Sequence, residues 1–384
     1  FLIPYLISVF IIGLPLMILE TGAGQKLKKS LPNYLNKDVL GKISWLPIIM
    51  GLVILSYYIV ITGWVLFQSI NLPLSSESSF IQGAQPLASI PISLLIVGIA
   101  FTVAISGLHR GLEKTLNVLI PLFLVGLLAL FLFSVSQPGN WEQVTKIFTP
   151  DFSKILDGKT WLFAMSQAIF SLSIGYTILY CYGAYLGTRK SLATSLFIVA
   201  FADTLVALIS VGTTLPVALA SGEASGFSLS FDSTLSLFAR MPSGIIFGSI
   251  FFFLLFLAAF TSIISMFETP LFTIQDYFKT SRKKAAAITA LVLTPLIVFS
   301  AYSYAGVNLL GKPAIETIDL VFGSLLAPFS VLILLAIFTF KLDIEKLLNE
   351  SSVPKKLVTP TIIATRIAIA IMLVLGVIGL LEII

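Results

Sequence analysis

The sequence predicts an all-α protein that crosses a membrane about ten times. Apolar residues make up 57% of the chain and charged residues 11%, and the mean hydropathy is +1.04. Soluble domains carry about 25% charged residues, so this composition excludes a soluble protein. The net charge of +5 does not indicate nucleic-acid binding, because the basic residues lie in short loops between apolar segments.

Ten segments are long and apolar enough to cross a bilayer, which takes roughly 20 residues as a helix. We expect these spans at residues 1–23, 43–70, 88–108, 115–135, 160–186, 192–220, 243–277, 285–304, 314–340 and 358–384. Together they predict a single transmembrane domain over residues 1–384. The hydrophilic stretch 221–242 mixes apolar pairs with polar residues and predicts a capping loop outside the cell.

The distribution of basic residues predicts the orientation. The loops after the first, third, fifth, seventh and ninth spans carry 17 of the 23 Lys and Arg residues, and the opposite loops carry five. Cytoplasmic loops of membrane proteins are enriched in Lys and Arg. We therefore expect a multi-pass protein of the cell membrane, with the beginning of this chain on the extracellular side.

The chain has few residues that could serve as catalytic groups for hydrolysis or as metal ligands. Cys181 is the single cysteine and His109 the single histidine. One cysteine cannot form an intramolecular disulfide or a metal site alone, and no nucleophile–base pair is visible. We therefore expect no enzyme activity.

Polar residues within the spans are the candidate functional groups, because polar groups in hydrocarbon are costly and usually line a pathway or a ligand site. In the second span, the phenol of Tyr58 needs a partner, and a ligand carboxylate would serve; an aromatic anchor at the outer interface is the alternative. In the fifth span, Ser171, Ser173 and Gly175 favour a break in the helix whose free backbone groups can bind an ion. Close packing of small residues explains the same pattern.

Asp203 lies 13 residues beyond Lys190, roughly 20 Å into the sixth span. A carboxylate at that depth needs a cation or a proton. We therefore interpret Asp203 as a cation ligand or proton carrier.

In the seventh span, small and hydroxyl residues recur on one helix face. Their spacing is i, i+3, i+4 and i+7, and they are Ala258, Thr261, Ser262 and Ser265. Hard oxygen ligands suit small cations, although such hydroxyls also bond to their own helix carbonyls. The remaining carboxylates of interest are Glu20, Asp276 and Asp319.

Taken together, these strings resemble the neurotransmitter:sodium symporter family in its prokaryotic branch. Six matches occur in the family's order: Phe1 to Tyr5 with Gly13 to Pro15 and Glu20; Tyr57 and Tyr58 with Trp64; Phe170 to Tyr176; Ala202 to Thr204; Phe238 to Pro242; and Leu257 to Ser262 leading to Glu268. The resemblance implies an inverted-repeat transporter fold, of leucine-transporter type, with a broken helix near residues 171–176. It also implies that the ten spans correspond to family helices two to eleven, so the first family helix would lie before Phe1.

The resemblance assigns roles to individual residues. Tyr58 and Phe170 resemble the aromatic lid over the substrate. The residues that match the substrate pocket are Ile54, Ser171, Ser173, Tyr176, Ser262 and Met266. Ser171 and Asp203 match ligands of a sodium ion that touches the substrate, and Ala258, Thr261 and Ser262 match a second sodium site. Both sites would be incomplete without the first family helix.

The gates and the coupling also follow from the resemblance. Tyr185 and Asp276 match the inner gate, and Asp319 matches the carboxylate of the outer gate. Animal members of the family place a neutral side chain and a bound chloride at the position of Asp203. Here the carboxylate would balance the sodium charge itself, so we expect no chloride requirement.

The expected function is sodium-coupled import of a hydrophobic or aromatic amino acid by alternating access. A proton-coupled or exchange-type amino-acid transporter of the same fold is the first alternative, and a channel-like or structural membrane protein is the second. The expected partners are the amino acid, sodium and the lipid bilayer, with no nucleic acid. The sequence leaves open whether the protein forms a homo-oligomer.

Overall fold

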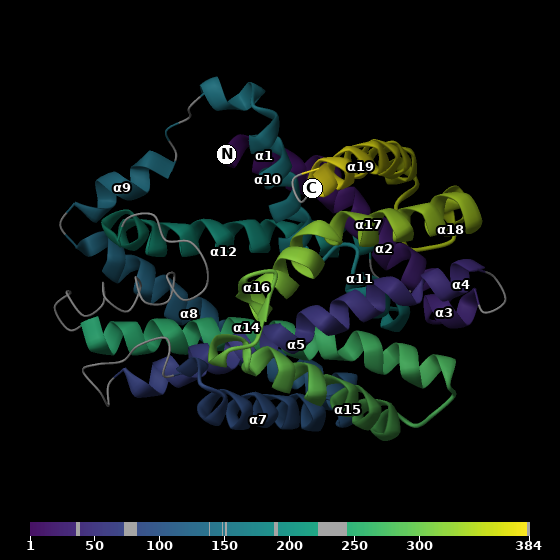
Figure 1. The fold of residues 1–384 in the computed structure, drawn as a ribbon. Helices are drawn as coiled ribbons and strands as arrows, with labels where there is room; N and C mark the ends of the chain where they lie inside the picture. Colours follow the sequence, from purple (N-terminus) through teal and green to yellow (C-terminus); the bar gives the residue numbers. More distant parts are fainter. Residues whose placement is uncertain are drawn as a thin grey trace.

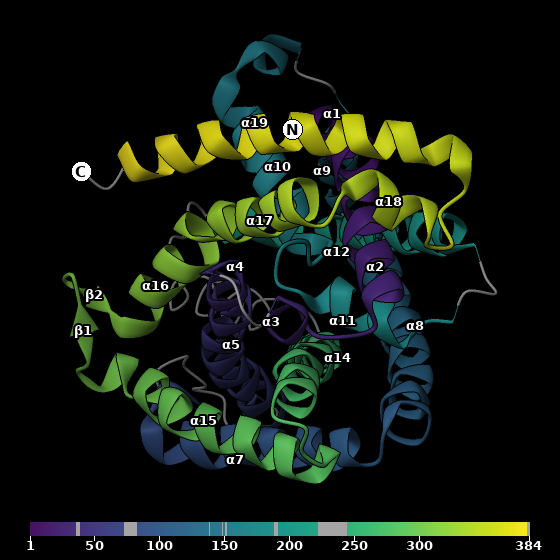
Figure 2. The ribbon, with the colours of Figure 1, turned by 90° about the vertical axis from the view of Figure 1, so that its right-hand side faces the viewer.

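The apolar segments fold into helices that run alongside one another, with α5 and α14 near the middle (Figures 1 and 2). The computed structural model describes residues 1–35, 39–72, 83–137, 139–147, 149, 152–187, 191–221 and 244–381. Apart from Ser221, the predicted capping loop 221–242 lies outside the described residues, as does the motif Phe238 to Pro242.

The first half of the chain forms five of the predicted spans and short interfacial helices, with η marking π- or 3₁₀-helical segments. The elements are α1 (Leu2–Ile7), η1 (Ser8–Gly13), α2 (Leu14–Leu27), α3 (Leu31–Tyr34), α4 (Val39–Ile43), α5 (Trp45–Asn71), α7 (Pro86–Ile105), η2 (Leu108–Glu113), α8 (Lys114–Ser136), α9 (Asn140–Ile147), η3 (Phe152–Leu156), α10 (Gly158–Ser171) and α11 (Ile178–Tyr185).

The second half is also almost entirely helical. Its elements are α12 (Leu192–Ser221), α14 (Gly244–Tyr277), α15 (Arg282–Ala301), η4 (Ser303–Ala305), β1 (Asn308–Leu309), β2 (Lys312–Pro313), α16 (Ala314–Ile318), η5 (Asp319–Leu325), α17 (Ala327–Ala336), η6 (Ile337–Lys341), α18 (Ile344–Asn349) and α19 (Lys355–Leu381). β1 and β2 form a small antiparallel hairpin that pairs Asn308 with Pro313 and Leu309 with Lys312.

The predicted all-α membrane fold is confirmed. Within the described ranges, nine helical stretches are long and apolar enough to span a membrane. The fifth predicted span, residues 160–186, is instead divided into α10 with 14 residues and α11 with eight, so neither half crosses alone. This division is the predicted broken helix, and it falls between Ser171 and Ile178.

Two large apolar clusters hold the helices together. One joins α1, η1 and α2 to α10, α17 and α19, and the other joins α5 and α7 to α14 and α15. In Figure 2, α17 and α19 lie at one edge of the molecule, and α7 and α15 at the opposite edge. The broken helix lies between the two clusters, since Ile174 belongs to the first and Tyr176 to the second.

Two glycines let α2 and α11 approach each other very closely. A Cβ on Gly24 would lie 2.0 Å from the carbonyl oxygen of Tyr180, and a Cβ on Gly183 would lie 2.1 Å from that of Thr21. Small residues permit such close backbone contact between membrane helices. The contact anchors α11, the second half of the broken helix, on α2.

Candidate functional site

The break between α10 and α11 is built from residues in left-handed backbone conformation. Ser173 has φ +56°, Gly175 φ +93° and Thr177 φ +60°. Only glycine adopts positive φ without steric cost, so two of these three residues hold a strained conformation. Such strain persists only where surrounding structure enforces it, and it concentrates at functional sites.

The backbone of Gly175 is held on both sides by side chains from other spans. Its N–H donates to Glu20 Oε2 of α2 over 3.0 Å, and its carbonyl accepts a hydrogen bond from the Ser330 hydroxyl of α17. Backbone groups released from a helix inside a membrane must find new partners. A Cβ at Gly175 would lie 2.4 Å from Cγ2 of Val331, so packing against α17 also requires glycine.

Ser171 and Asp203, both predicted sodium ligands, are in direct contact. The Ser171 hydroxyl at the end of α10 donates to Asp203 Oδ2 of α12 over 2.6 Å. The Asp203 side chain is half-buried, and its second carboxylate oxygen is not used by this bond. The contact therefore places a carboxylate at the broken end of a membrane helix.

The predicted ligands on α14 converge on one backbone oxygen. The Thr261 hydroxyl donates to the Ala258 carbonyl over 2.7 Å, and the Ser262 hydroxyl contacts the same oxygen at 3.5 Å. Ser265 donates in turn to the Thr261 carbonyl over 3.2 Å. The Ala258 carbonyl oxygen and the Thr261 and Ser262 hydroxyl oxygens therefore lie within about one helical turn, on a face that is not buried. A small cation would be coordinated if the two hydroxyls rotated their lone pairs toward it.

Several residues predicted to line the substrate pocket share one cluster. Tyr58 of α5 interacts with the side chain of Ser262 on α14. Ile54 and Tyr176 are buried in the cluster, and Tyr58 and Met266 pack against it. The structure thereby brings together residues from α5, α14 and the break, which lie far apart in the sequence.

A cavity of about 480 Å³ lies beside the break, between α10, η5 and α17. It is lined by Phe170, Tyr176 and Asp319 among others, and Phe170 is 51% exposed. Ligand pockets in proteins run from about 300 to about 1000 Å³, so this cavity has the volume of a small-molecule site. Ser173, the remaining predicted pocket residue, is half-buried within the break.

Asp319 is held by Tyr57, a residue to which the sequence assigned no role. The Tyr57 hydroxyl donates to Asp319 Oδ1 over 2.6 Å. A Cβ at Gly323 would lie 2.7 Å from this oxygen and 3.0 Å from the Tyr57 hydroxyl. The π-helical turn η5 therefore brings its carboxylate against α5 only because position 323 lacks a side chain.

At the other end of the bundle, Tyr185 contacts Glu268 rather than Asp276. Its hydroxyl donates to Glu268 Oε1 over 2.8 Å. Arg282 donates to both carboxylate oxygens of Glu268, at 2.7 and 2.6 Å, and its Nε donates to the Ala104 carbonyl over 2.6 Å. The Glu268 side chain is 1% exposed. This network joins α7, α11, α14 and α15.

Asp276, the other predicted inner-gate residue, has different partners. Its Oδ2 accepts hydrogen bonds from the backbone and hydroxyl of Ser30, at 2.7 and 2.9 Å, and from Asn33 at 2.8 Å. Its Oδ1 contacts the Lys279 amine at 3.0 Å. The carboxylate therefore fixes α3 against the end of α14, and the structure does not bring it together with Tyr185.

A signal for the Glu268 network was present in the sequence. Glu268 stands in the apolar run from Met266 to Leu271, and a charge in such a run needs a partner. Arg282 begins the next helix and is the partner. Tyr57 had no comparable signal, because the resemblance assigned the lid to its neighbour Tyr58.

Comparison with known proteins shows which families and folds this chain is similar to. The profile of the Sodium:neurotransmitter symporter family matches residues 1–80 and 79–380. An uncharacterized sodium-dependent transporter of Methanocaldococcus jannaschii is 32% identical over 337 residues, which cover 79% of this chain and 68% of the relative. The uncharacterized sodium-dependent transporter YhdH of Bacillus subtilis is 25% identical over 373 residues, covering 91% and 82%. The mouse sodium-dependent neutral amino acid transporter B(0)AT2 is 25% identical over 226 residues, covering 48% and 31%.

A solved structure matches nearly the whole chain. The crystal structure of MhsT in complex with L-phenylalanine superimposes with a TM-score of 0.84 and 27% sequence identity, over 98% of this chain and 91% of MhsT. This likeness confirms the predicted inverted-repeat transporter fold.

Proposed function

Because this chain belongs to the sodium:neurotransmitter symporter family, we propose that it imports a hydrophobic or aromatic amino acid with sodium, by alternating access and without chloride. The family and the relatives named above are all described as sodium-dependent transporters or sodium symporters. The proposal adds the substrate class, the ion sites and the chloride independence.

One observation carries the proposal: the Asp203 carboxylate is bonded to Ser171 at the end of α10. A carboxylate in a medium of low dielectric constant attracts a cation strongly. The adjacent break frees backbone groups that an amino-acid zwitterion or an ion can use. A cation bound here would lie next to a substrate bound at the break, so that each would favour binding of the other.

The apolar pocket lining supports a hydrophobic or aromatic substrate. Ile54 and Tyr176 are buried in one apolar cluster and Met266 packs against it, so a substrate bound beside them would meet aliphatic, aromatic and thioether groups. The matched MhsT structure has L-phenylalanine bound, which agrees with this class. Tyr58 would supply the polar contact, because its hydroxyl can donate to the substrate carboxylate.

The oxygen cluster on α14 supports a second sodium site. The Ala258 carbonyl and the Thr261 and Ser262 hydroxyls are neutral hard oxygens, which suit a small cation. The interaction of Ser262 with Tyr58 connects this cluster to the substrate pocket. Occupancy of the second site would therefore affect the position of the tyrosine lid.

The test is uptake of labelled amino acids by proteoliposomes that contain the full-length transporter. We expect accumulation of leucine, phenylalanine or tryptophan under an inward sodium gradient, unchanged when gluconate replaces chloride. Uptake that follows a pH gradient and ignores sodium would replace the proposal with a proton-coupled carrier that uses Asp203. Uptake that does not saturate with substrate would contradict any carrier.

Asp203→Asn tests the role of the carboxylate directly. Removing the charge weakens sodium binding, and a loss of about 1.4 kcal/mol raises half-saturation tenfold. We expect the sodium concentration for half-maximal uptake to rise about tenfold or more. Added chloride should partly restore the sodium affinity. Unchanged sodium and chloride dependence in Asp203→Asn would overturn the sodium assignment.

A further inference from the structure

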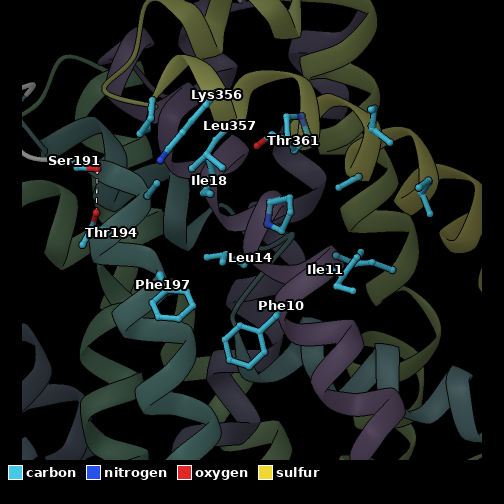
Figure 3. A pocket seen from close by; sticks show the side chains of 18 residues that line it. Phe10, Ile11, Leu14, Ile18, Ser191, Thr194, Phe197, Lys356, Leu357 and Thr361 are labelled. Atoms are coloured by element: carbon cyan, nitrogen blue, oxygen red, sulfur yellow. Dashed lines mark hydrogen bonds between the residues drawn. The ribbon is translucent and has the colours of Figure 1, made fainter.

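A groove lies between η1 and α2 on one side and α12 and α19 on the others, and its described lining includes no residue of α10 or α11. Its volume is about 1010 Å³, at the upper end of protein ligand pockets, about 300 to 1000 Å³. Figure 3 shows Phe10, Ile11, Leu14 and Phe197 lining one end of the groove. Ile11 is 61% exposed and Phe197 49% exposed, so these apolar side chains are open to a ligand.

The opposite end of the groove is polar and basic. Ser191 and Thr194 lie there, joined by a hydrogen bond of 3.2 Å between their hydroxyls. In the view of Figure 3, Lys356 extends across this end with its nitrogen toward the side of the two hydroxyls. No lining residue in the described ranges is acidic. Among the described residues, the Lys356 amine forms no ion pair.

We propose that this groove binds one anionic phospholipid, with its phosphate at Lys356, Ser191 and Thr194 and an acyl chain along Phe10, Ile11 and Phe197. The charge pattern identifies the occupant. A lysine amine and two hydroxyls are donors suited to a phosphate, and the apolar remainder suits hydrocarbon. A zwitterionic lipid would gain less, because its headgroup cation would meet the lysine.

The groove also matches the geometry of the bilayer. Ser191 directly precedes α12 and Lys356 lies in the first turn of α19, and the charge distribution assigns the loops before these two helices to the same side of the membrane. A lipid of that leaflet would therefore place its headgroup at the polar end of the groove, near the membrane surface, and its acyl chain at the apolar end, deeper in the bilayer. Basic pockets between membrane helices on the cytoplasmic side commonly bind anionic headgroups.

Native mass spectrometry of the full-length protein tests the proposal. The detergent-solubilised transporter is incubated with equal amounts of phosphatidylglycerol and phosphatidylcholine. One basic residue near a membrane surface corresponds to about a fivefold preference for an anionic lipid, and we expect at least that excess of phosphatidylglycerol adducts. Equal retention of the two lipids would overturn the proposal.

Two matched pairs of variants locate the site. Lys356→Gln should abolish the preference, whereas Lys355→Gln should keep it, because Lys355 is also exposed but does not line the groove. Ile363→Trp fills the groove and should reduce total lipid retention. Ile246→Trp adds the same bulk to an exposed position on α14 outside the groove, and should not.

The same mass spectra distinguish the proposed lipid site from two alternatives. Equal loss of preference in Lys355→Gln and Lys356→Gln would mean diffuse surface attraction and would overturn the site. A dimer mass that Ile363→Trp converts to monomer would mean that a second copy covers the groove, and would overturn the lipid assignment. The melting temperature of each variant, measured beside wild type, separates loss of binding from loss of fold.

Discussion

The Tyr57 hydroxyl donates a hydrogen bond of 2.6 Å to Asp319 Oδ1 and so joins the middle of α5 to the first residue of the π-helical turn η5. Tyr58, the next residue, interacts instead with Ser262 of α14. Two adjacent tyrosines therefore connect one helix to two different partners. The Tyr57–Asp319 bond lies at the cavity beside Phe170, whereas Ser262 belongs to the oxygen cluster around the Ala258 carbonyl.

Tyr57→Phe removes only the hydroxyl that holds Asp319. Hydrogen bonds to charged groups contribute about 1.5–3 kcal/mol. If Asp319 belongs to the outer gate, we expect about a tenfold fall in substrate uptake efficiency, measured as Vmax/KM in proteoliposomes. Tyr302→Phe is the control, because Tyr302 is 44% exposed in a loop. If Tyr57→Phe transports as well as wild type, the hydrogen bond between Tyr57 and Asp319 does not contribute to gating.

Thr261→Ala distinguishes a sodium ligand from a hydroxyl that merely bonds to its own helix. Thr261 donates to the Ala258 carbonyl over 2.7 Å, and Thr273 on the same helix donates to the Thr269 carbonyl over 3.0 Å. A loss of about 1 kcal/mol corresponds to about a fivefold weaker sodium dependence. We expect this change in Thr261→Ala and not in Thr273→Ala, measured by sodium titration of substrate binding. Equal effects would favour helix packing for both.

Gly175→Ala should destabilise the protein. The residue has φ +93°, and a Cβ would lie 2.4 Å from Val331 Cγ2. Strained backbone alone costs about 1–3 kcal/mol, and the clash adds to it. We expect a clearly lower melting temperature in detergent.

Gly98→Ala is the matched control for Gly175→Ala. A Cβ at Gly98 meets nothing within 4 Å, and alanine in a helix is favoured over glycine by about 0.5–1 kcal/mol. We expect an unchanged or slightly higher melting temperature. A similar fall in both variants would mean that the break does not require glycine.

Arg282→Ala leaves the Glu268 carboxylate, which is 1% exposed, without its cation. Breaking a buried pair by removing one partner costs about 3–5 kcal/mol. We expect a large loss of stability, measured by thermal or chemical unfolding, with partial recovery in Arg282→Lys.

Lys279→Ala is the comparison for the ion pair of Arg282. The Lys279 side chain is 68% exposed in its pair with Asp276, and surface pairs contribute about 0–1 kcal/mol. We expect little change. If Arg282→Ala were as mild as Lys279→Ala, the Glu268 network would not hold α14 and α15 together.

The apolar segments determined the fold class, because a bilayer leaves a helix few alternatives and its thickness sets the length of each span. The break between Ser171 and Ile178 was predicted through the family resemblance, because the serines and the glycine by themselves fit close helix packing as well. Asp203 was identified by depth alone, because a carboxylate so far into a span needs a partner wherever the other helices lie.

The tertiary structure decided which groups meet. Tyr57 and Tyr58 are adjacent in the sequence, and the positions of η5 and α14 around α5 place one against Asp319 and the other against Ser262. In the same way, helix packing places the Tyr185 hydroxyl against Glu268, whereas Asp276 accepts hydrogen bonds from Ser30 and Asn33. A single chain encodes the cost of burying each polar group, but its partner comes from helices distant in sequence, whose arrangement is set by packing across the whole bundle.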